Sequence, residues 1–382
     1  MNFELDEEQG LFRDAIDRLL QKEYGFEQRR RHAATAEGWS RTVWAQFAEQ
    51  GFLALPFDSA HGGLGYGAVE TMLVMEAMGR ALTLEPYLST VLLAGGALKA
   101  AASAQQLGDL VPRIVAGDLV LTVALQEKQS RFNLADVATT AVPDGDGYRL
   151  RGTKIAVPHG GSADLCLVVA RTAGARSDCD GIGLFAVTTD APGLRRRAYR
   201  TQDGSRAADF ILDDVFVPRG QVIGEPGSAL PAVERAVDGA IAAIAAEAVG
   251  CMQAALDLSV DYLKQRQQFG APIGRFQALQ HRAAEMLVEV EQARSMAMLA
   301  ALVVDEPDVA ERRKTLSAVK AQIGRSGRIV GQLAVQLHGG IGVTEEYAVG
   351  HYFKRLTMIE AQFGDADYHL GRIAAAGGLI AA

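Results

Sequence analysis

The chain has 382 residues, of which 49% are hydrophobic and 22% are charged, and its formal net charge is −8. This length is too great for one ordinary core, so we expect two or three domains, and the balanced composition is typical of a folded protein. The acidic balance, with no basic domain to offset it, argues against nucleic acid as the main partner.

Nothing at the N-terminus predicts export or a membrane anchor. The first residues, MNFELDEEQGLF, are acidic and lack the basic and apolar regions of a signal peptide. The longest strongly apolar run, residues 239–246, is far shorter than the ~20 residues that a membrane span needs. Cys166, Cys179 and Cys251 show no CxxC or Cys/His spacing. We therefore predict a cytoplasmic protein without a metal site or a membrane partner.

Residues 1–118 are predicted to be helical. Asp6 and Gln9 have the spacing of a capping box, and apolar residues follow at helical intervals from Leu11 onward. The glycine-rich segment HGGLGYG at 61–67 precedes a further helix, but it lacks GxGxxG spacing and no strand comes before it. We interpret it as a turn rather than as a nucleotide-binding loop.

The pattern changes at residue 119 and changes back near 223. Residues 119–222 contain short β-forming runs separated by Gly, Pro and Asp, namely LVLTVAL, YRLRG, DLCLVVAR, GLFAVTTD and DFILDDVFVP. They predict an antiparallel sheet or a small barrel. Helical periodicity returns over 223–382. The predicted order is a helical domain at 1–118, a β domain at 119–222 and a second helical domain at 223–382.

The segment RQQFGAPIGRFQALQHR at 266–282 joins two long predicted helices that must run roughly antiparallel, because the connection is short. Gly270 and Pro272 suit such a reversal. Arg266 and Phe269 are not needed for the turn. An arginine beside an aromatic ring can bind a diphosphate and pack on an adenine. The alternative is a surface arginine beside a core phenylalanine.

A second segment, QLAVQLHGGIGVTEEY at 332–347, predicts a helix end at His338 followed by Gly339 and Gly340, where the backbone can approach a ligand. Taken together, this segment and the joint at 266–282 resemble the acyl-CoA dehydrogenase family of flavoproteins. The resemblance covers essentially the whole chain, since LDEEQGLFRDAIDRLL and GFLALPFDSAHGGLG resemble the family's N-terminal helical domain and GYRLRGTKI resembles its middle β domain.

The resemblance implies a mainly α fold with a central β domain: an N-terminal helical domain, a middle antiparallel β-barrel or sandwich and a C-terminal four-helix bundle. It implies FAD, oxidation of an acyl-CoA to the trans-2-enoyl-CoA in fatty acid or steroid side-chain β-oxidation, and electron-transfer flavoprotein or a similar acceptor. It also implies a same-family dimer or tetramer, because the residues that match the family's motifs contact the FAD of a neighbouring subunit. These residues are Arg266, Phe269, Gln336, Gly339 and Gly340.

The catalytic base departs from the family pattern. One family position aligns with Phe363 and the other with Ala240, and neither can accept a proton. Glu247 lies two helical turns after Ala240 in an apolar stretch, where burial would raise the pKa of a carboxylate toward that of a base. Asp365, two residues after Phe363, is a second candidate. A third possibility is that this chain has no base.

The flavin ring site also departs from the family pattern. Of the family's glycine-rich loop only Glu127 survives, and Ala156-Val157-Pro158 stands where the family has a tryptophan and a hydroxyl residue over the ring. Glu127 and Pro158 remain the cofactor-binding candidates there. Two alternatives stay open: a working homomeric enzyme in which backbone N–H groups replace the lost hydroxyl, or a catalytically degenerate partner subunit, as in heteromeric α2β2 enzymes, that completes a neighbour's FAD site.

Overall fold

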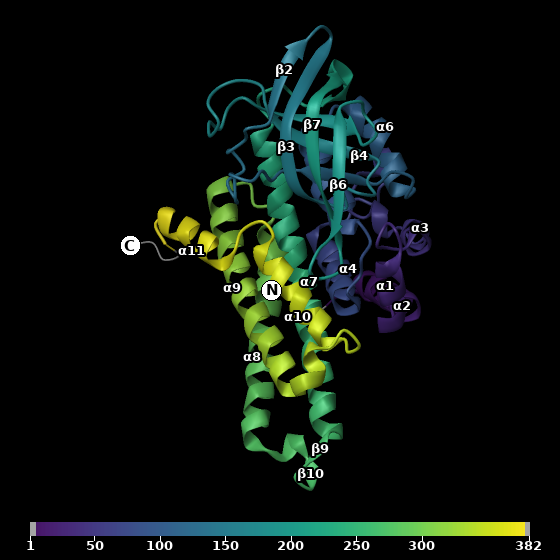
Figure 1. Ribbon diagram of the computed structural model, residues 1–382, viewed down its shortest axis with the longest axis vertical. Coiled ribbons are helices and arrows are strands. Elements are labelled where there is room, and N and C mark those ends of the chain that lie inside the picture. Colours follow the sequence, from purple (N-terminus) through teal and green to yellow (C-terminus); the bar gives the residue numbers. More distant parts are fainter. Residues whose placement is uncertain (1–4, 379–382) are drawn as a thin grey trace. The chain divides into compact units, whose positions relative to one another are not determined.

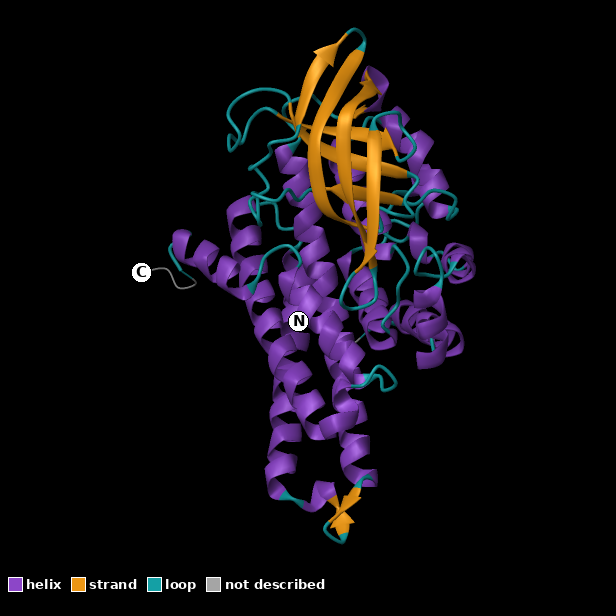
Figure 2. Cartoon of the chain, viewed as in Figure 1, coloured by secondary structure: helices purple, strands orange, loops and turns teal. Residues whose placement is uncertain are grey.

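The structure is a computed structural model that describes residues 5–378. Its chain packs into two compact units, each assembled from segments that are far apart in the sequence. Unit 1 comprises Met1–Arg31, Ala68–Thr83 and Ile241–Ala382, and unit 2 comprises His32–Gly67 and Leu84–Ala240. Figure 1 labels the helices and strands, and Figure 2 colours them by type.

Unit 1 is helical. Its helices, with α2 and α7 extending into unit 2, are α1 (Glu7–Glu23), α2 (Phe26–Ala34), α4 (Ala68–Ala81), α7 (Leu230–Gln265), α8 (Gln277–Val303), α9 (Val309–His338), α10 (Val349–Ala361) and α11 (Ala366–Ala375). The capping box predicted at Asp6 is present, since Asp6 and Gln9 exchange side-chain to backbone hydrogen bonds. Helix α9 packs against α8, α10 and α11, and α4 packs against α1 and α8. The C-terminal part of the chain is therefore a helical bundle.

Helix α7 is apolar along most of its length. A window of it has a mean hydropathy of 1.6, so by length and composition this helix could cross a membrane, but 83% of the window is buried inside the protein. Alanine, isoleucine, valine and leucine side chains account for most of this hydropathy. We conclude that α7 is a core helix rather than a membrane span.

Unit 2 contains a mixed sheet with helices beside it. The helical elements are α3 (Arg41–Glu49), a π-helical turn at Leu88–Ala94, α5 (Gly95–Ala101) and α6 (Ala104–Val115). The strands are β1 (Leu121–Ala124), β2 (Thr140–Asp144), β3 (Gly147–Pro158), β4 (Leu165–Arg171), β5 (Ile182–Thr188), β6 (Leu194–Arg200), β7 (Arg206–Pro218) and β8 (Val222–Ile223). Their order is β6-β7-β3-β2-β4-β5-β8, and β1 pairs with β4.

The predicted fold class is confirmed, with two corrections in the β domain. Strand β1 runs parallel to β4, and β2 meets β4 in a parallel pair, so the sheet is mixed rather than purely antiparallel. Among the described strands, β6 and β8 end the sheet without pairing with each other, so there is no closed barrel. The core of the sheet is built from residues such as Val157, Phe185, Phe210 and Leu212. Side chains that alternate with these core residues lie on the outer face of the sheet.

Candidate functional site

The joint between α7 and α8 folds differently from a simple helix turn. Helix α7 ends at Gln265, and two short strands, β9 (Gln267–Gln268) and β10 (Ala271–Pro272), form a small hairpin at the tip of the α7–α8 pair (Figure 1). Phe269 and Gly270 are the two central residues of its turn, and both have positive φ, 57° and 79°. A two-residue hairpin of this kind requires such angles.

Phe269 gains little within its own chain from this position. Its side chain is 92% exposed, and the one ring contact it makes within residues 5–378 is an edge contact with Phe276, at 6.0 Å between centroids. A non-glycine residue in the left-handed region costs roughly 1 kcal/mol. An aromatic ring held in a strained turn and turned away from the core is typical of a binding contact, so the alternative of a core phenylalanine is wrong for Phe269.

The glycine pair lies at the end of α9. Gly339 has φ 62° and ψ −138°, a conformation that favours glycine, and no atom lies within 4 Å of the place where a Cβ would stand at Gly339 or Gly340. The residue before them, His338, is buried, and a 2.8 Å hydrogen bond between its Nδ1 and the Ala334 carbonyl fixes its ring. Burial lowers the pKa of His338, so the imidazole is neutral near pH 7. The residue that precedes the open glycines is therefore buried and fixed in orientation.

Tyr262 brings the two sequence segments together. Its ring stacks on His338 with 4.5 Å between centroids, and its carbonyl accepts the backbone N–H of Arg266 at 2.9 Å. The last turns of α7, which lead into the joint, therefore pack against the residue that precedes the glycine pair, and we treat the exposed residues of the two segments as one candidate surface of unit 1. Tyr262 is not among the residues predicted from the sequence. Its position one helical turn before Arg266 could have indicated that it lies close to the joint.

This surface has the chemistry needed to bind a dinucleotide. Arg266 and Gln336 are exposed, and within residues 5–378 neither side chain forms a hydrogen bond or an ion pair. A free guanidinium suits a diphosphate, an exposed aromatic ring suits an adenine, and an amide beside open glycines can bond further oxygens. The residues present therefore fit FAD. Their individual contacts with FAD stay predictions.

The end of β3, in unit 2, carries the predicted ring contacts. Ala156 lies in a bulge with φ 52°, where its N–H donates to Asp209 Oδ1 at 3.2 Å. The Pro158 carbonyl accepts a 2.6 Å hydrogen bond from Thr122 Oγ1. Proline has no N–H and its carbonyl already accepts one hydrogen bond, so the main group that Pro158 offers a ligand is its apolar ring. A contact between the Pro158 ring and the cofactor stays a prediction.

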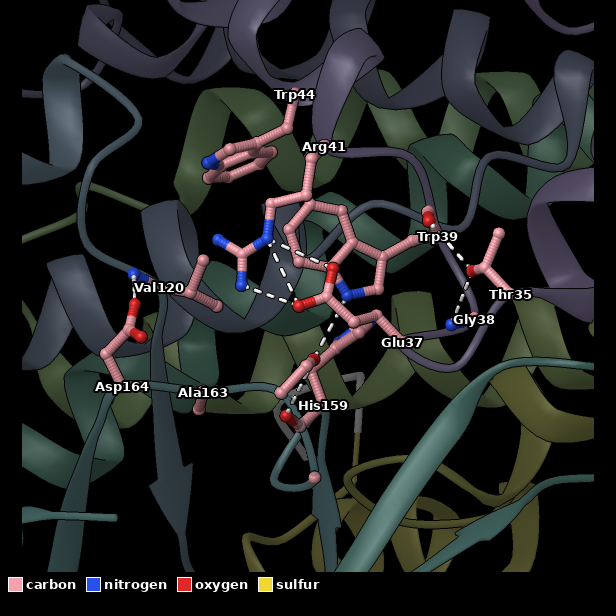
Figure 3. A network of polar contacts seen from close by, with 12 residues as sticks. Thr35, Glu37, Gly38, Trp39, Arg41, Trp44, Val120, His159, Ala163 and Asp164 are labelled. Carbon is pink, nitrogen blue, oxygen red and sulfur yellow. Dashed lines mark hydrogen bonds and ion pairs between the residues drawn. The ribbon is translucent and has the colours of Figure 1, made fainter. Parts of the chain in front are cut away.

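The residue after Pro158 is fixed by a polar network within unit 2 (Figure 3). The ring nitrogens of His159 lie 3.0 Å from the Leu84 carbonyl and 3.1 Å from Ser89 Oγ. Ser162 Oγ accepts the indole N–H of Trp39 at 3.0 Å and contacts the His159 carbonyl at 3.3 Å. The end of β3 is therefore a rigid support. In the sequence, His159 has no feature that separates it from an ordinary loop histidine.

Glu127 is occupied inside the β domain. Its carboxylate accepts hydrogen bonds from Lys154 Nζ at 2.7 Å and from the backbone N–H groups of Ala138 and Thr139 at 2.9 and 3.0 Å. Gln129 supplies a fourth at 2.8 Å. Burial alone would raise the pKa of Glu127, but the Lys154 ammonium and these hydrogen bonds outweigh it and lower the pKa to about 2. The structure thus gives Glu127 a supporting role, and a direct cofactor contact by it stays a prediction.

Glu247 has a partner that the sequence did not reveal. Arg355 of α10 donates to both of its oxygens, from Nε at 2.6 Å and from a terminal nitrogen at 2.7 Å. The two side chains form a largely buried ion pair, so the carboxylate in this apolar stretch is paired. The basic role of Glu247 stays a prediction.

Asp365 caps a helix. Its side chain accepts the Tyr368 N–H at 2.8 Å at the start of α11. Phe363, two residues earlier, has φ 58°, so the segment that aligns with the family's base is tightly bent. Because one carboxylate oxygen of Asp365 is used for capping, its chemistry is constrained although its catalytic role stays a prediction.

Comparisons with known proteins agree along the whole chain. Family models described as the N-terminal, middle and C-terminal domains of acyl-CoA dehydrogenase match residues 6–118, 122–215 and 231–378. The probable acyl-CoA dehydrogenase YngJ of Bacillus subtilis is 30% identical, with 96% of this chain and 97% of that protein covered.

Two solved structures show the same similarity. The steroid ACAD variant Tcur3481-Tcur3483 is 32% identical with a TM-score of 0.87, and 97% of each chain is covered. A solved structure named for the electron transferring flavoprotein of Acidaminococcus fermentans contains a chain that is 27% identical with a TM-score of 0.90, covering 98% of this chain and 99% of that one.

Proposed function

The chain belongs to the acyl-CoA dehydrogenase family, and we propose that it oxidises an acyl-CoA thioester between the α and β carbons to the trans-2-enoyl-CoA with FAD as cofactor. The observations that carry the proposal are the stacking of Tyr262, in the last turns of α7, on His338 beside the open glycines, and the exposure of Arg266 and Phe269 in the joint that follows α7. Within residues 5–378, the Arg266 side chain forms no hydrogen bond or ion pair, and Phe269 is 92% exposed.

We propose that Arg266, Phe269, Gln336 and the glycines Gly339 and Gly340 bind the diphosphate and adenine of FAD held by a second copy of the chain. Bound FAD supplies the acceptor for the hydride equivalent that leaves the β carbon. The chain itself must bind the thioester, exclude water and accept the α proton. Self-association follows from the proposal, because the FAD that these residues contact is held by a second copy of the chain.

For the α proton we propose Glu247 as the acceptor, with Asp365 as the weaker candidate. In the structure, Arg355 donates to both carboxylate oxygens of Glu247. A catalytic role would therefore require Arg355 to shift or to share its hydrogen bonds in the substrate complex. Asp365 has one carboxylate oxygen bound at the start of α11.

The electron acceptor and the assembly are proposals as well. The solved structure from Acidaminococcus fermentans is named for an electron transferring flavoprotein, which supports an acceptor of that kind for this chain. We propose assembly with a same-family chain, most simply a second copy. The degenerate-partner alternative is not favoured, because a relative named as a dehydrogenase in its own right matches almost the whole chain.

The test is to purify the chain alone. We expect a yellow protein with close to one FAD per subunit, which converts an acyl-CoA to a product lighter by two hydrogen atoms when an artificial electron acceptor is supplied. Absorbance gives the flavin content, and mass spectrometry gives the product. A colourless protein that takes up no added FAD would contradict the proposed function, and dioxygen consumption without another acceptor would favour an oxidase instead.

A further inference from the structure

An aromatic residue of β6 lies across the sheet from the predicted ring contacts. Strand register places Pro158 of β3 opposite Ala207 of β7, and Ala207 opposite Tyr199 of β6. The neighbouring residues Val157 and Ala208 point into the core. Because side chains alternate along a strand, Pro158, Ala207 and Tyr199 lie together on the outer face of the sheet.

Small side chains separate the two rings. Ala156 is exposed in the bulge, and Ala207 is the residue between Pro158 and Tyr199 in the register. Neither carries more than a methyl group, and although Ala207 itself is buried, the exposed methyl group of Ala156 lies between the proline ring and the phenol. A flat apolar surface with an aromatic border suits a planar heteroaromatic group.

Tyr199 is held toward Ala156 by a shared carboxylate. Its hydroxyl donates to Asp209 Oδ1 at 3.0 Å, and the N–H of Ala156 donates to the same oxygen at 3.2 Å. Arg197 binds the other oxygen, Oδ2, at 2.7 Å. Asp209 therefore fixes the phenol beside the bulge, while 36% of Tyr199 remains exposed. The ring is oriented without being covered.

We propose that Tyr199 is a cofactor-contacting residue of this chain, whose ring forms the aromatic wall of the flavin ring site beside Ala156 and Pro158. The inference rests on the proposed function. The aligned family positions carry alanine and proline here in place of an aromatic residue, and the structure supplies an aromatic ring from a neighbouring strand. The hydrogen bond to Asp209 orients the phenol, and the ring provides stacking area and excludes water.

The experiment measures FAD binding by apo-protein prepared from the full-length chain. Two variants separate the ring from its hydroxyl: Tyr199→Leu keeps apolar bulk without aromaticity, and Tyr199→Phe keeps the ring without the hydrogen bond. Phe216→Ala is the matched control, since Phe216 is also an exposed aromatic residue on the outer face, 40% exposed, at the opposite end of β7. Titration gives the FAD affinity, and flavin fluorescence reports an aromatic neighbour, because tyrosine in contact with the ring quenches it.

We expect Tyr199→Leu to bind FAD about tenfold more weakly and to show brighter bound flavin, on the order of one aromatic stacking contact. Tyr199→Phe should keep the affinity within a few fold, and Phe216→Ala should match the wild type in both readouts. The thermal melt of each apo-protein should be nearly unchanged, because the ring is exposed. Wild-type affinity and fluorescence in Tyr199→Leu would overturn the inference alone, whereas a wild-type chain that binds no FAD would overturn both it and the proposed function.

Discussion

Two buried cations of the β domain, Lys154 and Arg171, have different kinds of hydrogen-bond acceptor. Lys154, with no exposed surface, pairs with the carboxylate of Glu127. Among the described residues, Arg171 instead donates to backbone carbonyls alone. These carbonyls link two loops of the β domain and belong to Ala135, Val137, Ala173, Arg176, Asp178 and Asp180. The family resemblance singled out Glu127 as a surviving residue, but nothing in the local pattern pointed to Lys154, 27 positions away. Pairings of this kind depend on register between strands.

Glu247 shows the same limit at a candidate catalytic residue. The sequence correctly marks it as a charge within an apolar helix, and the structure finds it largely buried. Its partner, Arg355, is 108 residues away on another helix, and no pattern within α7 predicts it. A substitution of Glu247 alone therefore leaves a largely buried guanidinium without its carboxylate, so loss of stability must be separated from loss of chemistry.

A double substitution separates the two roles. We expect Glu247→Gln to lose several orders of magnitude in turnover and about 3 kcal/mol in the free energy of unfolding. Replacing both partners, Glu247→Leu with Arg355→Leu, should recover part of the stability, because the ion pair is removed as a unit, but none of the turnover. Denaturant unfolding and steady-state kinetics at low temperature measure the two effects. If the stable double variant turned over normally, Glu247 would not be the base.

At the scale of elements, the segment between α10 and α11 is a tight turn that is stabilised by hydrogen bonds from a lysine of α9. Phe363 and Gly364 have φ of 58° and 117°. Lys320 of α9, which has no exposed surface, donates to the Glu360 and Gly364 carbonyls at 2.9 and 2.7 Å. Desolvation lowers the pKa of Lys320 to about 8. The helix ends on either side were predictable from their periodicity, whereas this lysine lies on an ordinary helical stretch of α9.

The same reversal is predicted to be sensitive to acid. His369 of α11 is fully buried, and its Nε2 donates to the Phe363 carbonyl at 3.1 Å. Desolvation, assisted by the Lys320 charge, lowers the pKa of His369 to about 3. Because the unfolded chain binds this proton at an ordinary pKa of ~6.5, folded-state stability falls as the pH drops below that value and levels off near 3.

We expect the wild type to lose on the order of 2 kcal/mol more than His369→Gln in the free energy of unfolding between pH 7 and pH 5. Glutamine keeps a donor for the Phe363 carbonyl but does not titrate. His281→Gln, at an exposed position of α8, serves as the control and should show the wild-type pH dependence. Urea unfolding followed by circular dichroism at the two pH values gives the comparison, and equal losses in all three proteins would contradict burial as the cause.

At the scale of the molecule, the order of helical, β and helical segments could be predicted from periodicity, but the packing units could not. Unit 1 combines the first helices with the C-terminal bundle. A Cβ on Gly79 of α4 would lie 2.0 Å from the Glu247 carbonyl, and one on Gly250 of α7 would lie 1.9 Å from the Glu76 carbonyl. The two helices therefore touch through their backbones, which only glycine permits. In the sequence, these two glycines indicate only a low local helix propensity and not a contact between helices.

Cofactor binding and self-association should be linked if the α7–α8 joint serves a second copy of the chain. A ligand held by two chains stabilises their association by the same factor by which association stabilises the ligand. Added FAD should therefore shift the apo-protein toward dimer or tetramer in sedimentation velocity.

Arg266→Ala and Phe269→Ala should reduce that shift while keeping wild-type melting of the helices, because Phe269 is 92% exposed and Arg266 has no side-chain partner within residues 5–378. Leu287→Ala, at a half-exposed position on α8, controls for the loss of apolar surface alone. FAD binding that is independent of protein concentration, and unchanged in both joint variants, would show that each chain binds its cofactor alone.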